Sequence, residues 1–587
     1  MRFFKYLFPF AIAAGLALVS CDKDPQEGSG IHTKPVDGDE TVTPSTQEKS
    51  GFTMSTGYWA PAVRKVNVNG VEKLRMYYCL VPSNCIKTGS LDFDGSWTER
   101  AIIGMCESSD PAGDRWEDKG YVVCSSSDKG RDGYARSSES DWNAYFYYNA
   151  IDPTYIVNPA GDGKDYLIYG SWHSGFALLE IDHVTGKPVN APGDPWAGSA
   201  AELSSRFGVR IGTRNSNSRW QGSEAPEIIY KDGYYYLFMA YDGLDVPYNT
   251  RVVRSTSIEG PYKDITGRNF TNGRGDCFPI VTHPYKFSKG YGWVGISHCA
   301  VFPEEGGSEW FYMSQGRFPV NVGGNAYSNA LMMGHVRRLA WVPASPDTPD
   351  DLWPVALPER YGAVPQSPVS KEEIAGTWEH INLGYHYAAQ DASEDLLLLP
   401  DGTMSGALNG KWSYDAGTGL LTLDDNATAA PVCVKVTREL DWEASPRVPT
   451  LVYAGTGVSL NATWWGKKVA EADGSAIAAM PGYTAPSYND NYVSLAAWSH
   501  HDSWNLANTH DPSVAYFDGY YYEWGTDASY GNAHLDAASG RHFPGKRSRN
   551  LVDWEYVPGP FNATPQWAAD TLNSIRKRMG LKSIAKD

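Results

Sequence analysis

Residues 224–237 read EAPEIIYKDGYYYL, and this stretch decides the fold. An opening with proline is followed by a short apolar run, a turn at Lys231-Asp232-Gly233 and an aromatic run. The Asp-Gly pair favours a tight hairpin turn, and the flanking isoleucines and tyrosines favour strands. The stretch therefore predicts a β-hairpin whose first strand begins beside the proline.

The same pattern occurs five times along the chain, which indicates a repeat architecture. The first four openings are about 70 to 95 residues apart, a spacing that suits propeller blades of four strands and their loops. We therefore predict an all-β protein that contains a five-bladed β-propeller. The openings are Trp59-Ala60-Pro61, Asp152-Pro153-Thr154, Glu224-Ala225-Pro226, Ser297-His298-Cys299 and His510-Asp511-Pro512.

The geometry of a propeller gathers equivalent residues of its blades. The innermost strand of each blade lines the central channel, so equivalent positions form a ring. We expect the opening residues to converge at one mouth of this channel. Two aspartates, a glutamate, a histidine and a tryptophan in such a ring are typical of a site that cleaves sugars. These residues are Trp59, Asp152, Glu224, His298 and Asp511.

A different segment separates the fourth repeat from the fifth. Residues 376–468 contain short strands with glycine and aspartate turns, such as Asp401-Gly402, and no helical periodicity. They predict a small antiparallel β-barrel or sandwich, inserted into the propeller, with blade 1 supplied by the C-terminus. The predicted ranges are 51–365 for blades 2–5, 366–470 for the small β-domain, 471–500 for a linker and 501–587 for blade 1.

The N-terminus has the layout of an export signal. Arg2 and Lys5 precede an apolar run that is too short to span a bilayer comfortably, so residues 1–20 predict a signal peptide. Cys21 at the cleavage point resembles the lipidated cysteine of bacterial lipoproteins; an ordinary signal with a chance cysteine is the alternative. Residues 21–50 are polar and predict a flexible tether. We expect a lipid-anchored protein of the bacterial cell envelope, on its periplasmic or outer face.

The amino-acid composition limits which classes of molecule the protein can bind. The net charge of −18 argues against nucleic acid, whose binding needs a basic surface. Aromatic residues make up 13% of the chain, which suits ring faces presented to sugars, although a β-core uses the same residues. The cysteines after Cys21 show no metal-like spacing and predict mostly buried thiols. We expect a monomer that contacts the membrane only through its anchor.

These motifs resemble glycoside hydrolase family 43, in particular its two-domain arabinanases, over nearly all of residues 51–587. The family's His-Asp-Pro-Ser element matches His510 to Ser513, and its Trp-Ala-Pro element matches Trp59 to Pro61. Its small C-terminal β-domain resembles residues 376–468. The chain thus resembles a circular permutation of the family layout, cut between the first and second blades, which neighbouring termini in a closed ring would tolerate.

The resemblance implies three catalytic carboxylates. Asp511 matches the general base, Glu224 the general acid, and Asp152 the aspartate that tunes the acid and orients the substrate. The acid needs a pKa raised by burial and nearby negative charge, whereas the base must stay ionised. An inverting enzyme keeps the two roughly 6.5–9.5 Å apart to admit a water. On sequence grounds Glu227 competes with Glu224 as the acid.

The resemblance also implies a metal ion and a sugar cradle. His298 matches a channel histidine that lies beside a hydrated calcium ion in related arabinanases, although a lone histidine is more often a hydrogen-bonded core residue. Trp59 could equally be strand packing, and Arg317 could pair with a channel carboxylate. The candidate sugar-binding residues are Trp59, Asn149, Ser171, Trp172 and Arg317.

We therefore expect an inverting hydrolase that cleaves α-1,5-linked arabinan in plant cell-wall polysaccharide. Endo action, which cuts within the polysaccharide chain, is favoured over exo action. The same fold also supports exo-acting α-L-arabinofuranosidase or β-xylosidase activity. A non-catalytic sugar-binding lipoprotein would result if the C-terminal blade failed to dock and Asp511 never reached the channel. A retaining fructan or sucrose enzyme would need a Trp-x-Asn-Asp-Pro-Asn-Gly opening, which this sequence lacks.

Overall fold

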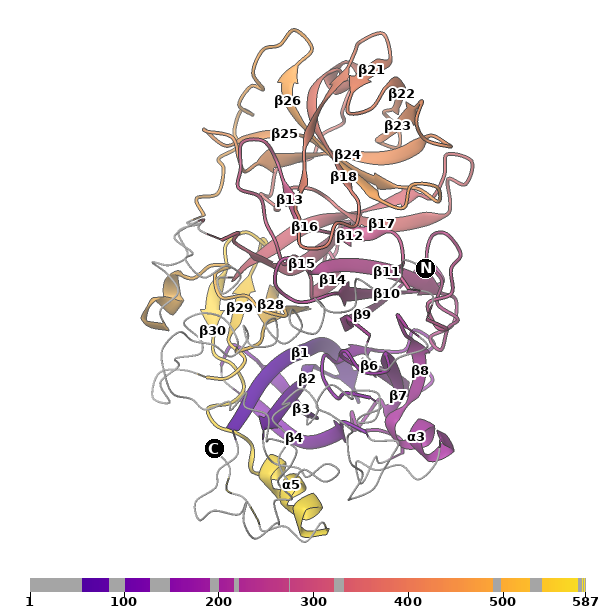
Figure 1. Ribbon diagram of the computed structural model, residues 1–587. Helices are drawn as coiled ribbons and strands as arrows, with labels where there is room; N and C mark the ends of the chain where they lie inside the picture. The colour runs from indigo at the N-terminus through magenta and orange to yellow at the C-terminus, as the bar shows by residue number, and fades with distance from the viewer. Residues whose placement is uncertain are drawn as a thin grey trace.

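The computed structural model consists of a propeller and a β-barrel packed against one side of it (Figure 1). Residues 1–54, and with them the predicted signal peptide, Cys21 and the tether, lie outside the described residues. No helix in the described ranges is long and apolar enough to cross a membrane. The structure describes residues 55–83, 101–113, 115–126, 148–190, 200–215, 221–273, 275–320, 322, 332–488, 498–527, 541–578, 583 and 585.

The propeller contains five antiparallel sheets of four strands, as the repeat predicts. The first two sheets are β1 (Ser55–Val68), β2 (Val71–Ser83), β3 (Ile102–Asp110) and β4 (Arg115–Cys124), then β5 (Thr154–Ile156), β6 (Lys164–Tyr169), β7 (Phe176–Asp182) and β8 (Val209–Gly212). The third and fourth are β9 (Ser223–Lys231), β10 (Tyr234–Tyr241), β11 (Asn249–Ser255) and β12 (Ile280–Thr282), then β14 (Cys299–Pro303), β15 (Trp310–Arg317), β16 (Met332–Pro343) and β17 (Leu352–Ala356). The fifth is β27 (Ser513–Phe517), β28 (Tyr520–Trp524), β29 (Gly545–Ser548) and β30 (Glu555–Val557).

The inner strands form a closed ring in the order β1, β5, β9, β14 and β27. A backbone contact repeats between neighbouring blades: the amide of Ile228 donates to Oγ1 of Thr154, and the amide of Val301 donates to Oε1 of Glu227. The amide of Val63 donates to Oγ of Ser513 in the same way, at 2.9 Å. The sheet β27–β30 therefore occupies an ordinary blade position beside β1, although it comes from the C-terminal end of the chain.

A buried ion pair in the channel joins all five inner strands. Nη2 of Arg64 on β1 lies 2.6 Å from Oε2 of Glu227 on β9, with side chains 19% and 7% exposed. Arg64 also donates to Oγ of Ser513 and to Oγ1 of Thr154, from the fifth and second sheets. Glu227 in turn accepts the amide of Val301 from the fourth sheet. One pair of side chains thus sets the spacing of the ring.

We predict that Arg64→Met destabilises the protein by about 3–5 kcal/mol, because it leaves the Glu227 carboxylate buried without its partner. The measurement is the midpoint of urea unfolding followed by tryptophan fluorescence. Lys65→Met is the matched control, since Lys65 faces solvent and lies 3.9 Å from Glu72 in a surface pair, worth about 0–1 kcal/mol. Equal shifts for the two variants would contradict a joining role for Arg64.

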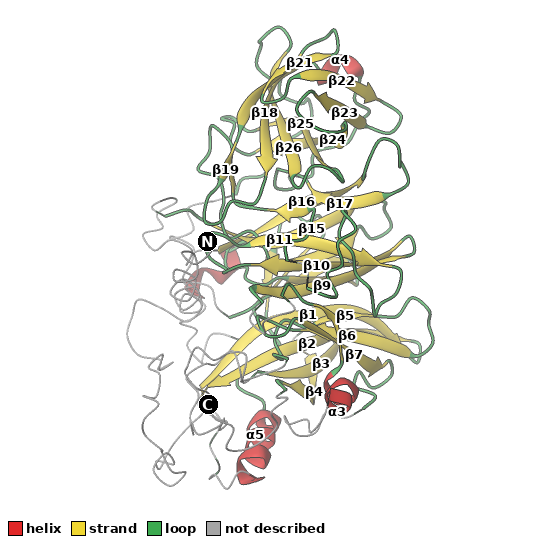
Figure 2. Ribbon diagram, turned by 45° about the vertical axis from the view of Figure 1, so that its right-hand side comes forward, coloured by secondary structure: helices red, strands yellow, loops and turns green. Residues whose placement is uncertain are grey.

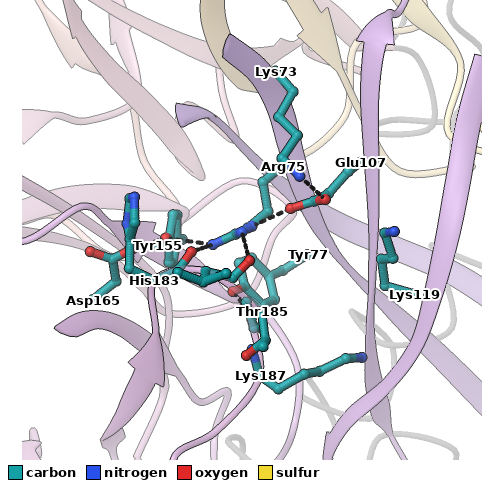
Figure 3. Close-up of polar contacts among 12 residues, drawn as sticks. Lys73, Arg75, Tyr77, Glu107, Lys119, Tyr155, Asp165, His183, Thr185 and Lys187 are labelled. Carbon is teal, nitrogen blue, oxygen red and sulfur yellow. Dashed lines mark hydrogen bonds and ion pairs between the residues drawn. The ribbon is translucent and has the colours of Figure 1, made fainter. Parts of the chain in front are cut away.

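A second buried cluster joins the first two sheets away from the channel (Figure 3). Arg75 on β2 is fully buried, and its Nε donates to Oε1 of Glu107 on β3 at 2.8 Å. Its Nη1 donates to the hydroxyl of Tyr155 on β5 and to the carbonyl of His183, each at 3.0 Å. The contacts of Arg75 with Tyr155 and His183 cross from the first blade to the second, so we interpret the cluster as structural.

The β-barrel is closed by pairing between its first and last strands, β18 and β26. Its inner face is apolar around Trp378, Tyr453 and Trp464, and the one-turn helix α4 (Lys371–Ile374) precedes it. The strands are β18 (Gly376–Leu383), β20 (Glu394–Leu398), β21 (Thr403–Gly406), β22 (Gly410–Asp415), β23 (Leu420–Asp425), β24 (Val432–Asp441), β25 (Val448–Thr456) and β26 (Thr463–Glu471).

The barrel is fixed to the propeller by a shared core and by buried charge. Ile381 and Trp465 of the barrel pack in one cluster with Tyr285 of the propeller. Lys467 on β26 is ion-paired with Glu359, which follows β17, at 2.9 Å. A short parallel pair, β13 (Tyr285–Lys286) with β19 (Asp391–Ala392), adds a backbone link at the same junction. In Figure 2 the barrel accordingly lies directly over β16 and β17.

The fold is mostly β rather than all-β as expected, because helices occur between and after the strands. The helix α5 (Gln566–Arg578) follows the fifth sheet and contacts β4 at the edge of the propeller farthest from the barrel (Figures 1 and 2). Ala568, Ala569 and Leu572 recur at helical spacing and are buried, which stabilises a helix rather than a strand. The described residues also form α3 (Ala200–Phe207), α4 before the barrel and the 3₁₀ helix η4 (Trp498–Ser503). The cysteines in the described ranges are buried and form no disulfide with one another.

Candidate active site

One backbone feature repeats at the mouth of the channel in all five blades. A non-glycine residue with positive φ stands in the first part of the inner strand or within two residues before it: Ala60 (40°), Asp152 (54°), Ala225 (54°), His298 (53°) and Asp511 (50°). This conformation costs on the order of 1–2 kcal/mol per residue, because Cβ approaches the carbonyl oxygen. Strained residues of this kind gather at functional sites, so the repeat points to this mouth as the candidate site.

The positive φ values show that the predicted ring of equivalent residues was misaligned by one residue in two of the five blades. Trp59 and Glu224 were expected to be equivalent to Asp152, His298 and Asp511. In the structure their places in the ring belong to Ala60 and Ala225, and Trp59 and Glu224 come one residue earlier. Glu224 therefore comes one residue before the strained position of its blade, whereas Asp152 and Asp511 occupy the strained positions themselves. The shared proline that follows four of the five positions was the signal for the correct alignment.

Asp511 is held as an ionised carboxylate. Its Oδ1 lies 2.9 Å from Nδ1 of His298, and its Oδ2 accepts the hydroxyl of Thr526 at 2.8 Å. Burial alone would raise the pKa of Asp511, but His298, together with His510 and the hydrogen bond from Thr526, outweighs burial and holds that pKa well below its usual range. Burial likewise disfavours the charge of His298, but Asp511 raises the pKa of His298 to about 9. The two form a charged pair at neutral pH.

Glu224 has the opposite electrostatic environment. Its Oε1 accepts the hydroxyl of Tyr248 at 2.6 Å, and its Oε2 accepts Nε1 of Trp172 at 2.6 Å and the hydroxyl of Ser171 at 3.0 Å. Burial raises the pKa of Glu224, and the negative charge of Asp511 adds to the rise, whereas the bond from Tyr248 opposes it. This carboxyl therefore keeps its proton to higher pH than a free glutamate.

Asp152 lies beside Glu224 and shares its proton-retaining environment. Oδ2 of Asp152 accepts the amide of Ala225, the residue after Glu224, at 3.0 Å. Asp152 is 6% exposed. Burial, reinforced by the charges of Glu224 and Asp511, raises its pKa well above the usual range. The hydrogen bond to Ala225 links the second and third blades and fixes the backbone that carries Glu224.

Glu227, the competing candidate for the acid, binds residues of other blades instead of facing the mouth. Both of its oxygens bind Nη2 of Arg64, and it also accepts the hydroxyl of Thr154 at 2.7 Å and the amide of Val301 at 3.2 Å. These contacts engage the carboxylate in joining the blades. Between the two glutamates, only Glu224 faces the cluster formed by Asp511 and His298.

Three of the predicted sugar-binding residues lie around Glu224. Ser171 and Trp172 follow β6 and donate directly to its carboxyl. Asn149 is buried, accepts the hydroxyl of Ser125 at 2.9 Å and donates to the carbonyl of Ser171 at 3.3 Å. Asn149 therefore supports the Ser171 loop from behind, and its direct contact with a sugar stays a prediction.

Arg317 and Trp59 lie at other parts of the mouth. Arg317 at the end of β15 is 1% exposed, and its Nη2 lies 3.4 Å from Nε2 of His510, the neighbour of Asp511. Trp59 is half-buried and packs against the core of the first sheet. Its indole lies over Gly57, where a Cβ atom would come within 2.7 Å of Nε1.

Sequence reasoning missed three residues that hold the carboxyls. Tyr248 and Thr526 donate to Glu224 and Asp511, and Oε1 of Gln315 accepts the amide of Asp511 at 3.0 Å. Tyr248 precedes β11, Thr526 follows β28 and Gln315 lies within β15. None belongs to the repeated opening, so no spacing in the sequence connects them to the site.

Comparison with known proteins places this geometry in a family. A family model described as glycosyl hydrolases family 43 matches residues 37–337, slightly more than half of the chain. The chain belongs to glycosyl hydrolase family 43. A second model, described as a C-terminal lipocalin-like domain, matches residues 358–466, which include most of the barrel of this family 43 protein.

The second match corrects the expectation of a domain inserted into the propeller. The barrel is the family's C-terminal domain and follows the matched propeller region, residues 37–337. It is closed by its own β18–β26 pairing, so it does not depend on the surrounding sheets for its hydrogen bonds. Residues 513–557, after the barrel, add the fifth sheet of the propeller.

The relatives of this family 43 chain include arabinanases at low identity. The extracellular endo-α-(1→5)-L-arabinanase of Thermotoga petrophila is 25% identical over 479 residues, which cover 77% of this chain and 89% of the relative. The extracellular endo-α-(1→5)-L-arabinanase 2 of Bacillus subtilis is 25% identical over 352 residues, 56% of this chain and 67% of the relative. The chain is thus a glycoside hydrolase distantly related to extracellular arabinanases.

Solved structures agree in fold. The crystal structure of endo-1,5-α-L-arabinanase from Thermotoga petrophila aligns with a TM-score of 0.54 and 24% identity, over 70% of this chain and 84% of that chain. The family 43 YxiA protein from Bacillus licheniformis aligns with a TM-score of 0.53 and 22% identity, over 70% of this chain and 83% of that chain. At these identities the likeness concerns the fold alone.

We predict that Tyr248→Phe moves the alkaline limb of the pH–rate profile to higher pH. The hydroxyl of Tyr248 donates to Glu224 and lowers its pKa, so its removal raises the pKa of Glu224 and keeps the acid protonated to higher pH. The measurement is kcat/KM for polysaccharide hydrolysis against pH. The control is Tyr230→Phe at the far end of β9, which should leave the profile unchanged; a limb that stays in place in Tyr248→Phe would contradict Glu224 as the titrating acid.

Proposed function

We propose that this protein is an inverting hydrolase that cleaves α-1,5-linked arabinan within the chain. The observation that carries the proposal is the opposite electrostatics of two carboxyls at one mouth: the pKa of Asp511 is held low by His298, and the pKa of Glu224 is raised by burial. Environments that separate two carboxyl pKa values in this way assign a base and an acid. The names of the relatives support arabinan as the substrate.

In the proposed reaction Asp511 takes a proton from a water molecule, whose oxygen attacks the anomeric carbon. The glycosidic carbon–oxygen bond breaks, and Glu224 gives its proton to the leaving oxygen. Asp511 precedes β27 and Glu224 lies on β9, and these inner strands are not neighbours, because β14 with His298 lies between them. Carboxyls on separated blades favour the wider spacing of an inverting enzyme, which leaves room for the attacking water.

The remaining roles complete the proposal. Asp152 would modulate the acid, since its carboxyl lies beside Glu224 and each disfavours ionisation of the other. Trp172 and Ser171 would orient Glu224 and meet the sugar next to it, with Asn149 behind them. Trp59 and Arg317 would border the same cradle. Export with a lipid anchor at Cys21 is supported by the N-terminal sequence, and the relatives are described as extracellular.

We predict that Asp511→Asn lowers the hydrolysis of arabinan by about 10²–10⁴-fold, because the amide cannot accept the proton of the attacking water. Product analysis of residues 22–587 with linear arabinan, branched arabinan and arabinoxylan is the measurement. Asp518→Asn is the matched control, since Asp518 is an exposed turn residue of the same blade and asparagine tolerates its positive φ.

The products separate the alternatives. Short arabino-oligosaccharides released from linear arabinan and lost in Asp511→Asn support endo-hydrolysis. Arabinose or xylose alone would keep the acid and base assignments but make the enzyme exo-acting. Absence of product from every substrate, with sugar binding retained, would contradict hydrolysis and leave a sugar-binding protein.

We also propose that a calcium ion binds beside His298. Nδ1 of His298 is held by Asp511, so only Nε2 can face an ion. Among the described residues of this mouth, no three carboxylate or imidazole atoms lie within 4.8 Å of one another. Calcium prefers oxygen ligands, so the arrangement fits an ion held mainly by water. Such an ion would supply positive charge next to the reacting sugar. The groups around it would be the carboxyls of Asp511, Glu224 and Asp152 and the imidazole of His298.

We predict that calcium added to chelator-treated protein raises the midpoint of thermal unfolding, because a ligand that binds the folded state stabilises it. The same addition to His298→Gln should give a smaller rise. An unchanged midpoint in both proteins, with hydrolysis unaffected by the chelator, would contradict the calcium proposal and leave the catalytic assignment intact.

A further inference from the structure

The inner face of the barrel becomes polar toward one end. Alternate residues of β18 face the interior: Trp378 is fully buried, His380 is 4% exposed and Asn382 is exposed. At this end the barrel opens into a cavity of about 580 Å³. A cavity of this size lies within the range of small-molecule sites, and the mouth of a β-barrel is a common place for one.

His380, which lines this cavity, carries an unsatisfied polar atom. Its Nδ1 lies 2.8 Å from the hydroxyl of Tyr453, and its Nε2 is buried without a hydrogen-bond partner. Burial lowers the pKa of His380 to about 3, so the imidazole is neutral. A buried polar atom without a partner costs free energy. A ligand hydroxyl in the cavity would supply the missing partner.

The other walls combine an aromatic ring with hydrogen-bonding groups. The Trp464 ring meets the His380 ring at 5.4 Å, nearly edge to face. Asp425 accepts the amide of Asn409 through Oδ1, which leaves Oδ2 for a ligand. Asn382 and Glu394 stand at the exposed rim. A ring floor surrounded by amide, carboxylate and imidazole groups suits a polyhydroxylated ligand.

Other classes of ligand fit less well. A lipid would leave the carboxylates and the imidazole without hydrogen bonds. A divalent cation would need several ligand atoms close together. In the described part of the chain, such a group consists of Glu359, Asp441 and Glu443, whose ligand atoms lie within 4.8 Å of one another, and it lies outside this cavity. The Lys467 ammonium already lies between those three carboxylates. The cavity therefore favours a neutral sugar over a lipid or a divalent cation.

A loop at the rim of the cavity also contacts the blade that carries Glu224. The segment after β18 contributes His386 and Gln390 to the cavity wall. In the same segment, the hydroxyl of Tyr385 donates to Oδ2 of Asp242 at 2.7 Å. The amide of Asp242 donates to the carbonyl of Gly222, two residues before Glu224. One short loop therefore borders both the barrel cavity and the blade that carries the acid.

From this arrangement we propose that the barrel mouth is a second carbohydrate site, which binds a short stretch of the same polysaccharide that the propeller cleaves. The proposal rests on the proposed function for the identity of the sugar. Recognition uses Nε2 of His380 and Oδ2 of Asp425 for hydroxyl groups and the Trp464 ring as an apolar surface. The site would hold the polysaccharide beside the loop that contacts the Glu224 blade, without touching the reacting bond.

The test is calorimetric titration of the full chain with arabinotriose in the Asp511→Asn background, where the sugar is not consumed. We expect two binding sites per chain. Asn382→Trp, which fills the exposed rim, should remove one site and leave the other unchanged, and His380→Gln should weaken the same site. Leu397→Trp is the matched control, since Leu397 is exposed on a barrel strand outside the cavity, and it should retain both sites.

The outcomes separate this inference from the proposed function. A single site that persists in Asn382→Trp overturns the barrel site, even where the wild-type protein cleaves arabinan. Loss of a site in Leu397→Trp as well as in Asn382→Trp also overturns it. Two sites reduced to one by Asn382→Trp support the barrel site, even where the wild-type protein releases no product and the proposed hydrolysis fails.

Discussion

The ion pair between Arg64 and Glu227 is the constraint on which the rest of the propeller depends. A ring of five sheets is held together by contacts between blades, and this pair reaches every inner strand through Ser513, Thr154 and Val301. Its residues follow the strained openings by a few positions on the same strands. The pair therefore fixes not only the width of the channel but also the positions at which the side chains of the mouth begin.

The mouth itself is organised by charge. Asp511 and His298 form an ion pair across neighbouring blades, whereas Glu224 is surrounded by the neutral donors Tyr248, Trp172 and Ser171. One imidazolium cannot neutralise three buried carboxyls, so the pKa is raised for the two carboxyls, Asp152 and Glu224, that are not ion-paired with it. The different behaviour of chemically similar groups thus follows from which blade carries the histidine.

The hairpins, the repeat and the barrel could be predicted from the sequence because they depend on local patterns. The Asp-Gly turns lie between strands as expected at Asp232 and Asp518, and the candidate carboxyls do gather at one mouth. The alignment of Glu224 failed by one residue, because it matched the charged residues of the openings instead of the prolines that follow the strained positions. The choice between Glu224 and Glu227 required the position of Arg64, and the helix α5 lay outside every repeat.

The order of the blades along the chain has a consequence for biosynthesis. Glu224, Asp152 and His298 all precede the barrel, whereas Asp511 and the strand that closes the ring follow it. A nascent chain can therefore fold four sheets and an entire second domain while the ring still lacks one sheet and the mouth lacks one of its carboxylates. The full set of site residues can come together only after the ribosome has synthesised almost the whole polypeptide. A prematurely terminated product that ends before residue 511 therefore contains Glu224 but lacks Asp511.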